Sequence, residues 1–579
     1  MHPTRPLRRS LLLLLSLLTA CGAAQSPPAA ATGSAATVST AQAAPPPAPR
    51  RRAPIPPGSA AMLTGRFASS QGDLDTAALA FQRALAADMD NEELRQKAFL
   101  TSLMAGRPEA ERLAGLLGRN QAAQLLLAGR DAKAGAWAQA EARFASLPRE
   151  GAAEIMRPIL IAWAQLGRGQ PDAALATLQP LIDNRAFRAF YALHGALIAD
   201  LSDRKGLAAR LYRTAQTEFG GTAHLQLGRA IASWEARQGN AAEAEAALRA
   251  VAEGNDDIMM ALPRLQADAA TLPVRNALDG LAETYVVLAS MLRGQDTSDF
   301  ALALVRLALQ LRPDHATARL IASDILGAGK RPELALDLLA GIRADDPLHA
   351  TVQMRRARML QRLERSDEAL SLLEEIARDY PSRPEPLGLT GDILRIKRRF
   401  AEAVVAYDRA IALAGPPHPG HWPLYYDRGI ALERSHQWEK AEADFLQALR
   451  FAPDRPHVLN YLGYSWTEQG RNLQQAKEMI EKAVQQRPND GAMVDSLGWV
   501  AMRMGNIPEA VRLLERAVEL EPGDATINGH LGHAYWEAGR RLEAIYQWRR
   551  ALNLKPEADE KERLENRLRP AEQQLGITP

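Results

Sequence analysis

Small residues recur along the chain at fixed intervals, with larger apolar residues at a constant distance behind them. In the clearest copies a Gly is followed by Ala after 12 residues, by a second Ala after 7 more, and by Pro after a further 5: Gly429/Ala441/Ala448/Pro453, Gly498/Ala510/Ala517/Pro522 and Gly532/Ala544/Ala551/Pro556. Small residues let paired helices approach closely, and Pro stops the second helix. Because successive copies start 34 or 35 residues apart, the pattern predicts an all-α solenoid of paired antiparallel helices.

The same period extends through most of the chain and predicts about 12 to 14 repeats. Regular copies also begin at Ala289, Ser323, Ala357, Gly391 and Gly463, and weaker copies begin at Gly65, Ala98, Ala128, Ala162, Ala196 and Ala232. Between the last weak copy and the copy that begins at Ala289, the 34-residue spacing is interrupted. Pro263 and Pro273 also prevent a long helix in this segment. We therefore expect a degenerate N-terminal lobe over 58–251, an irregular connector over 252–281 and a regular array over 282–556.

A bulky apolar residue follows each small residue after sixteen positions and is predicted to fill the core. Members of this register are Phe81, Phe144, Tyr212, Tyr407, Phe445 and Trp548. The unit resembles the tetratricopeptide repeat (TPR), whose ladder of small residues and terminal Pro these copies reproduce. That resemblance implies a TPR superhelical solenoid, and residues 557–579 would then form a helix that caps its last repeat.

The N-terminus has the features of an export signal. Three Arg residues precede an apolar stretch from Leu11 to Leu18, too short to span a bilayer, and residues 1–20 are therefore a predicted signal peptide. Leu18-Thr19-Ala20-Cys21 resembles the bacterial lipobox, which implies cleavage before Cys21, acylation of its thiol and an outer-membrane location facing the periplasm. The alternative is a plain signal peptide in which this Cys is accidental.

Residues 21–57 are rich in Ala, Ser, Thr and Pro and have almost no large apolar residues. Such a segment buries too little surface to fold and is predicted to be a disordered tether. The formal net charge of the chain is only +2, which gives no electrostatic basis for nucleic-acid binding. With a single Cys, neither an intramolecular disulfide nor a Cys-based zinc site can form.

A search for catalytic motifs indicates that the protein is not an enzyme. No nucleophile elbow, zinc-protease motif or paired carboxylates stand out, and no cofactor or small-molecule substrate is expected. His530, His533 and Glu537 have a helical spacing that would suit a metal, but they lie in the first helix of a repeat, where His is a common surface residue. We therefore predict no metal site.

Binding is the remaining function, and the resemblance to TPR arrays places it on the first helix of each repeat. The position after the small residue faces the concave groove in that family; here it holds Tyr464, Trp499 and His533. Neighbouring groove positions hold His457, Asn460 and Asp495, and the far ends of these helices hold Arg434, Arg503 and Trp536. Alternatively, Tyr464 and Trp499 pack between repeats. A clamp for a C-terminal carboxylate is not expected, because Asn460 has no Lys nearby.

Two functional classes follow from this reading. The lipobox, tether and repeats resemble the TPR lipoprotein adaptors of carboxyl-terminal processing proteases, which implies a protein-binding adaptor that brings a periplasmic enzyme and its clients together. The alternative is a structural scaffold in an envelope machine that exports exopolysaccharide or assembles pili or secretins. The sequence does not decide between them.

Overall fold

The computed structural model describes residues 58–118, 120–184, 186–219, 224–253, 255–292, 298–329 and 331–577. Over these residues the chain forms 30 α-helices, one short 3-10 helix and no strand, which confirms the predicted all-α repeat fold. The predicted signal peptide, Cys21 and the predicted tether lie outside the described residues. Among the helices that are described, none is long and apolar enough to cross a membrane.

Nearly all helices follow one another as repeat pairs. In the N-terminal half they are α2 (Ser59–Gln71) with α3 (Leu74–Ala87), α4 (Glu92–Ala105) with α5 (Glu109–Ala114), α6 (Gln121–Lys133) with α7 (Trp137–Ala145), α8 (Gly151–Gly167) with α9 (Pro171–Asp183), α10 (Arg188–Leu201) with α11 (Lys205–Glu218), and α12 (Leu225–Arg237) with α13 (Ala241–Ala252).

The pairing resumes after α14 (Asp256–Ala267), which does not form a repeat pair with the helix that follows it. The later pairs are α15 (Ala277–Met291) with α16 (Ser298–Leu311), α17 (Ala316–Ala328) with α18 (Pro332–Ala340), α19 (His349–Arg362) with α20 (Ser366–Asp379), α21 (Glu385–Ile396) with α22 (Phe400–Leu413), α23 (Trp422–Arg434) with α24 (Trp438–Phe451), α25 (Pro456–Glu468) with α26 (Leu473–Gln486), α27 (Gly491–Arg503) with α28 (Ile507–Leu520), and α29 (Ala525–Glu537) with α30 (Arg541–Asn553). The short helix η2 (Pro419–His421) lies between α22 and α23, and α31 (Ala558–Gln574) ends the series.

Small residues on one helix face large residues on its partner, as the sequence ladder predicts. A Cβ on Gly429 would lie 2.7 Å from the ring of Phe445, and one on Gly532 would lie 2.5 Å from Trp548. All six bulky residues of the predicted register are buried. The absence of a side chain on the first helix is therefore what lets the ring sixteen residues later lie between the two backbones.

Wherever the structure describes the whole turn inside a pair, at least one residue of that turn has the left-handed conformation. Gly is that residue in several repeats, for example Gly505 with φ 83°, and its amide bonds back to the end of the first helix. Asp203, Arg398 and His436 adopt the same conformation at φ 55–60° in other repeats. The turn geometry is thus common to all these repeats, even where the sequence does not provide Gly.

The chain forms two compact units, Met1–Ala369 (unit 1) and Leu370–Pro579 (unit 2). Within the predicted connector, residues 252–281, the structure has α14, which packs on α19 of the same unit. Asp257 in α14 pairs with Arg355 and Arg358 in α19 at 3.0 and 3.3 Å. The described part of unit 1 therefore includes both the predicted N-terminal lobe and the first helices of the predicted regular array.

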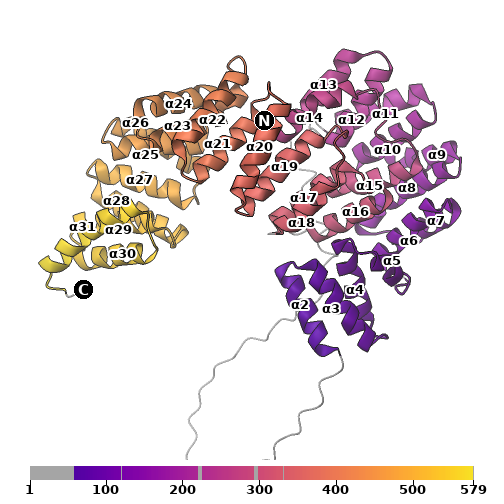
Figure 1. Ribbon diagram of the computed structural model, residues 1–579, viewed down its shortest axis with the longest axis horizontal. Coiled ribbons are helices and arrows are strands. Elements are labelled where there is room, and N and C mark those ends of the chain that lie inside the picture. The colour runs from indigo at the N-terminus through magenta and orange to yellow at the C-terminus, as the bar shows by residue number, and fades with distance from the viewer. Residues whose placement is uncertain are drawn as a thin grey trace, which may run out of the picture. The chain divides into compact units, whose positions relative to one another are not determined.

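Unit 1 folds back on itself. Helix α15 packs against α8, and α16 packs against α4 and α6, although more than 100 residues separate these helices in sequence (Figure 1). The helices approach closely at Gly280 in α15, where an added Cβ would lie 2.2 Å from the fully buried ring of Trp163 in α8. Polar contacts reinforce the arrangement, since Arg306 in α16 donates to the carbonyl of Met104 at 2.8 Å. Unit 1 thus has one continuous core that also contains non-neighbouring repeats.

Unit 2 is a simpler stack in which each described helix packs mainly on its sequence neighbours. Its buried residues divide into several smaller clusters along the array. The exception to this order is α31, whose N-cap residue Glu557 forms ion pairs of 2.8 Å with both Arg398 and Arg434, more than 120 residues earlier. Helix α31 therefore spans from the last repeat back to the first repeats of unit 2.

Candidate partner-binding groove

Aromatic side chains from three successive first helices meet in unit 2. Trp499 from α27 stacks on His530 from α29, with centroids 4.1 Å apart and planes 13° from parallel. Tyr464 from α25 lies 6.2 Å from His530, and His533 lies 6.0 Å from Trp499. We call Tyr464, Trp499, His530, His533 and Trp536 the aromatic groove. Tyr464, Trp499 and His533, which the sequence assigns to equivalent positions of successive repeats, thus lie around His530.

The central His530 is held in place by the carboxylate of Asp495. Its Nδ1 lies 2.9 Å from Asp495, and both side chains are buried. Burial lowers the pKa of His530, but the charge and the hydrogen bond of Asp495 outweigh it, so the pKa lies above its usual value. Asp495 therefore favours the protonated form of a ring that stacks on Trp499, and aromatic faces attract such a cation.

The edge of the groove that faces α30 and α31 is the more apolar one. Trp548 from α30 lies 5.3 Å from His533 and 5.5 Å from Trp536, and it packs in one cluster with Leu564 and Leu568 of α31. Burial, with further contributions from His530 and two Arg side chains of α31, lowers the pKa of His533 to about 3. His533 is thus neutral at physiological pH and serves as a half-buried ring.

Between these aromatic residues and α31 there is a cleft of about 530 Å³. Its walls combine rings with charges of both signs: Glu468, Trp499, Met502, Arg503, His530, His533, Trp536, Glu537, Trp548, Glu560, Arg563, Leu564, Asn566 and Arg567. Side chains with a large apolar face and a polar tip are those that contribute most at protein interfaces. The cleft thus has the chemical character of a peptide-binding or helix-binding surface.

The other predicted groove residues have varied positions. Arg503 and Trp536 line the cleft, and Arg541 lies over the Trp536 ring at 4.0 Å. Asp495 is buried and pairs with His530. Arg434 forms an ion pair with Glu557. His457 is exposed and Asn460 half-buried near the start of α25, and neither lines the cleft.

Trp548, Glu468 and several residues of α31 also line the cleft, although the repeat pattern does not predict them there. Trp548 is a core residue by register, and its second role depends on α31 lying beside it. The nitrogen of Trp499 donates to Glu468 at 2.5 Å, a contact between adjacent repeats that the 34-residue period could have indicated. Trp466 and Tyr535 are buried core residues.

The residues with a metal-like spacing have other partners. His530 is bound to Asp495, and no group of three or more His, Cys, Asp or Glu side chains among the described residues could hold a metal ion. The groove is thus built from stacked rings and ion pairs within the described part of unit 2.

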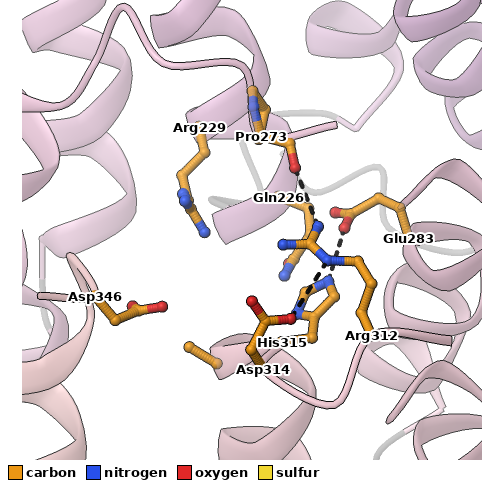
Figure 2. A pocket seen from close by; sticks show the side chains of 9 residues that line it. Gln226, Arg229, Pro273, Glu283, Arg312, Asp314, His315 and Asp346 are labelled. Atoms are coloured by element: carbon orange, nitrogen blue, oxygen red, sulfur yellow. Dashed lines mark hydrogen bonds and ion pairs between the residues drawn. The ribbon is translucent and has the colours of Figure 1, made fainter. Parts of the chain in front are cut away.

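A second, smaller pocket of about 70 Å³ lies within unit 1, between α12, α15 and α17 (Figure 2). There His315 caps α17 through Nδ1, and its Nε2 lies 3.1 Å from the buried carboxylate of Glu283. Burial raises the pKa of Glu283, but the hydrogen bond from His315 and the neighbouring charges outweigh it and hold the pKa below its usual value. Arg229 and Arg312 also extend into this pocket (Figure 2).

No side chain beside Glu283 has the position of an activated nucleophile in this described pocket, and the carboxylate is paired with His315, the N-cap residue of α17. A buried, ionised group held in this way connects helices. We therefore interpret the pocket as a structural ionic link between repeats of unit 1, and the aromatic groove of unit 2 as the better candidate for function.

Residues 354–419, 426–491 and 496–559 match the tetratricopeptide repeat family. These segments are TPR repeats. They extend from α19 to the start of α31 and therefore include every helix that contributes to the aromatic groove. TPR proteins are generally non-catalytic adaptors, which is consistent with the prediction that this protein is not an enzyme.

The chain is similar to one curated protein over part of its length and aligns with several solved structures at low identity. A TPR repeat-containing protein of Pseudomonas aeruginosa is 28% identical over 161 residues, and the match spans only 26% of that protein. Among solved structures, the Cut9–Hcn1 hetero-tetramer of the APC/C aligns with 89% of this chain and 96% of its own at 14% identity and a TM-score of 0.39. Yeast Tom70 aligns with 90% of this chain and 96% of its own at 14% identity and a TM-score of 0.33.

Proposed function

We propose that this protein is a non-catalytic adaptor that binds a protein partner in the aromatic groove of unit 2. The observation that carries the proposal is the row formed by Trp499, His530, His533 and Trp536, which borders a cleft of about 530 Å³. These rings are only partly buried or lie directly beneath a partly buried ring. A row of this kind offers a partner large contact areas on side chains that are already held in place, so little conformational entropy is lost on binding.

We further propose that the adaptor is attached to the outer membrane and faces the periplasm. The lipobox before Cys21 supports this, because two or more acyl chains on one residue suffice for stable anchoring. Its resemblance to TPR lipoprotein adaptors favours a carboxyl-terminal processing protease as the bound enzyme. Tethering enzyme and client to one scaffold would raise their effective concentration.

The anchor is tested by fractionation of cells that express Cys21→Ser. We expect the wild-type chain in the outer-membrane fraction and the variant in soluble periplasm, because Ser cannot be acylated through a thioether. Metabolic labelling with a palmitate analogue should mark only the wild type. A variant that stays in the membrane fraction would contradict the anchoring proposal.

The groove is tested by Trp499→Ala, with Tyr546→Ala as the matched control. Tyr546 is a 65% exposed aromatic residue on α30 of the same unit and does not line the cleft. Tagged full-length chains are purified from gently solubilised membranes, washed with salt, and their bound proteins quantified by mass spectrometry. We expect a periplasmic protease in near-stoichiometric amount with wild type and Tyr546→Ala, and at least a tenfold loss with Trp499→Ala.

Recovery of export or assembly components in place of a protease would contradict the protease proposal and favour the scaffold alternative. Equal recovery of the same partner by Trp499→Ala and wild type, with unchanged circular-dichroism melting, would show that the partner binds elsewhere.

A further inference from the structure

Helix α31 lies over the same groove that we propose as the partner surface. At its N-terminal end Glu557 bonds to Arg398, in the turn after α21, and to Arg434, the last residue of α23. One turn further on, Glu560 accepts a hydrogen bond from Thr526 at 2.7 Å. Arg563 and Arg567 line the cleft opposite Trp499. Helix α31 therefore occupies the surface of the array that we propose as the partner-binding site.

Helix α31 is attached by a small apolar contact and by ion pairs. Only four of its 17 residues are buried, namely Leu564, Leu568, Ala571 and Glu572. Leu564 lies over Gly529, where an added Cβ would be 3.2 Å from its methyl group, and Glu572 pairs with Arg549 at 2.7 Å. The Glu557 ion pairs join side chains that are more than one third exposed. Such pairs are weak and screened by salt.

The connection to α30 is short and contains a turn. Residues 554–557 join the two helices, and Lys555 has a φ of 57°. Because the four residues are not part of either helix, α31 can leave the groove as a unit while α29 and α30 keep their own contacts. Its removal would expose the full length of the aromatic groove.

We propose that α31 is a displaceable occupant of the aromatic groove, and that the groove accepts in its place a partner α-helix with the same pattern. That pattern is an acidic residue at the helix N-terminus, which meets Arg398 and Arg434, followed by two Leu residues four positions apart. This inference rests on the proposed function and gives it a partner class. The paired Arg residues at one end and Gly529 and Trp548 at the other select both the charge and the direction of such a helix.

The test uses a labelled peptide of residues 557–577 as the probe and the full-length chain as the receptor. Leu564→Asp/Leu568→Asp should release α31 in the receptor, because two carboxylates cannot be buried against Trp548 without a partner. We expect the wild-type peptide to bind this variant at least tenfold more tightly than it binds the wild-type chain, whose groove is occupied. Equal binding to both chains, or no binding to the released chain, would overturn the proposal.

Charge reversal tests the direction of the helix. In the released chain, Arg398→Glu/Arg434→Glu should reduce peptide binding at least tenfold, and a peptide with Glu557→Lys should restore it. Arg450→Glu, an exposed Arg on α24 that neither lines the cleft nor contacts α31, is the matched control and should leave binding unchanged. An equal effect of all three Arg substitutions would show non-specific attraction and would also overturn the proposal.

A measurement on the unmodified chain keeps the test independent of variant folding. In hydrogen exchange, amides of α31 should be at least 100-fold less protected than those of α29, and 0.5 M salt should widen the gap. Equal protection of α29 and α31 at both salt concentrations would contradict a displaceable helix. Failure here would leave the partner pull-down with Trp499→Ala valid, because a rigid groove that includes α31 still binds a partner.

Discussion

The close contact between Gly280 and Trp163 gives the sharpest stability prediction. In Gly280→Ala the new methyl carbon would lie 2.2–2.3 Å from three atoms of the Trp163 ring, whereas carbon atoms in contact are normally about 3.5–4.0 Å apart. The ring is fully buried and donates to His194 at 3.1 Å, so it cannot move away freely. Helices α8 and α15 must therefore separate.

The expected loss follows from three contributions. Overpacking of a filled core typically costs about 1–3 kcal/mol, and weakening the bond from Trp163 to His194 costs about 1 kcal/mol. Ala is a better helix former than Gly, which returns about 1 kcal/mol. We expect a net loss of about 2 kcal/mol in the unfolding free energy of unit 1, or roughly a 30-fold higher population of the opened state.

Urea-dependent hydrogen exchange, read by mass spectrometry on peptides from α8 and α15, measures this loss within unit 1. Gly206→Ala is the matched control, because Gly206 lies in α11 with no atom within 4 Å of an added Cβ. That change should leave unit 1 unchanged or stabilise it by up to about 1 kcal/mol. If Gly280→Ala and Gly206→Ala had the same effect, the fold-back of α15 onto α8 would be wrong.

Two further predictions concern single side chains. Burial lowers the pKa of His194 to about 3 from an ordinary 6.5. Between these two pH values the unfolded chain binds a proton that the folded chain does not. Unit 1 therefore loses stability as the pH falls through this range. In His194→Gln, which keeps an acceptor for Trp163, urea unfolding of unit 1 should lose less stability between pH 6.5 and 4 than in wild type; an identical loss would rule out His194 as a cause. His436→Gly should raise the thermal midpoint by relieving about 1 kcal/mol of left-handed strain, and a lower midpoint would contradict this account of the turn.

The repeat architecture could be predicted from sequence because it depends on local spacing. A Gly in one helix and a ring sixteen residues later, such as Gly429 and Phe445, must face each other whenever two helices are joined by a short turn. The groove residues Tyr464, Trp499 and His533 follow from the same register. His530 lies one turn before His533 on α29. Only the structure shows that Asp495 binds His530 and that the His530 ring stacks on Trp499.

Contacts between distant repeats could not be predicted in this way. The period defines each pair and its neighbours, whereas the curvature of the solenoid results from small rotations that accumulate over many pairs. Gly280 appears in sequence as one more small residue, and nothing near it points to Trp163. The path of α31 was equally hidden, because its few apolar residues predict a cap on the last repeat while the ion pairs of Glu557 depend on where Arg398 and Arg434 lie.

The fold-back in unit 1 also limits how this part of the chain can change during evolution. Open repeat arrays readily gain or lose a unit, since each new pair needs only two compatible neighbours. Between α8 and α15, however, an additional pair would shift Gly280 away from Trp163 and α16 away from α4 and α6. We therefore expect homologues to have a constant number of repeats in this region, and differences in repeat number to occur among the sequentially stacked repeats of unit 2.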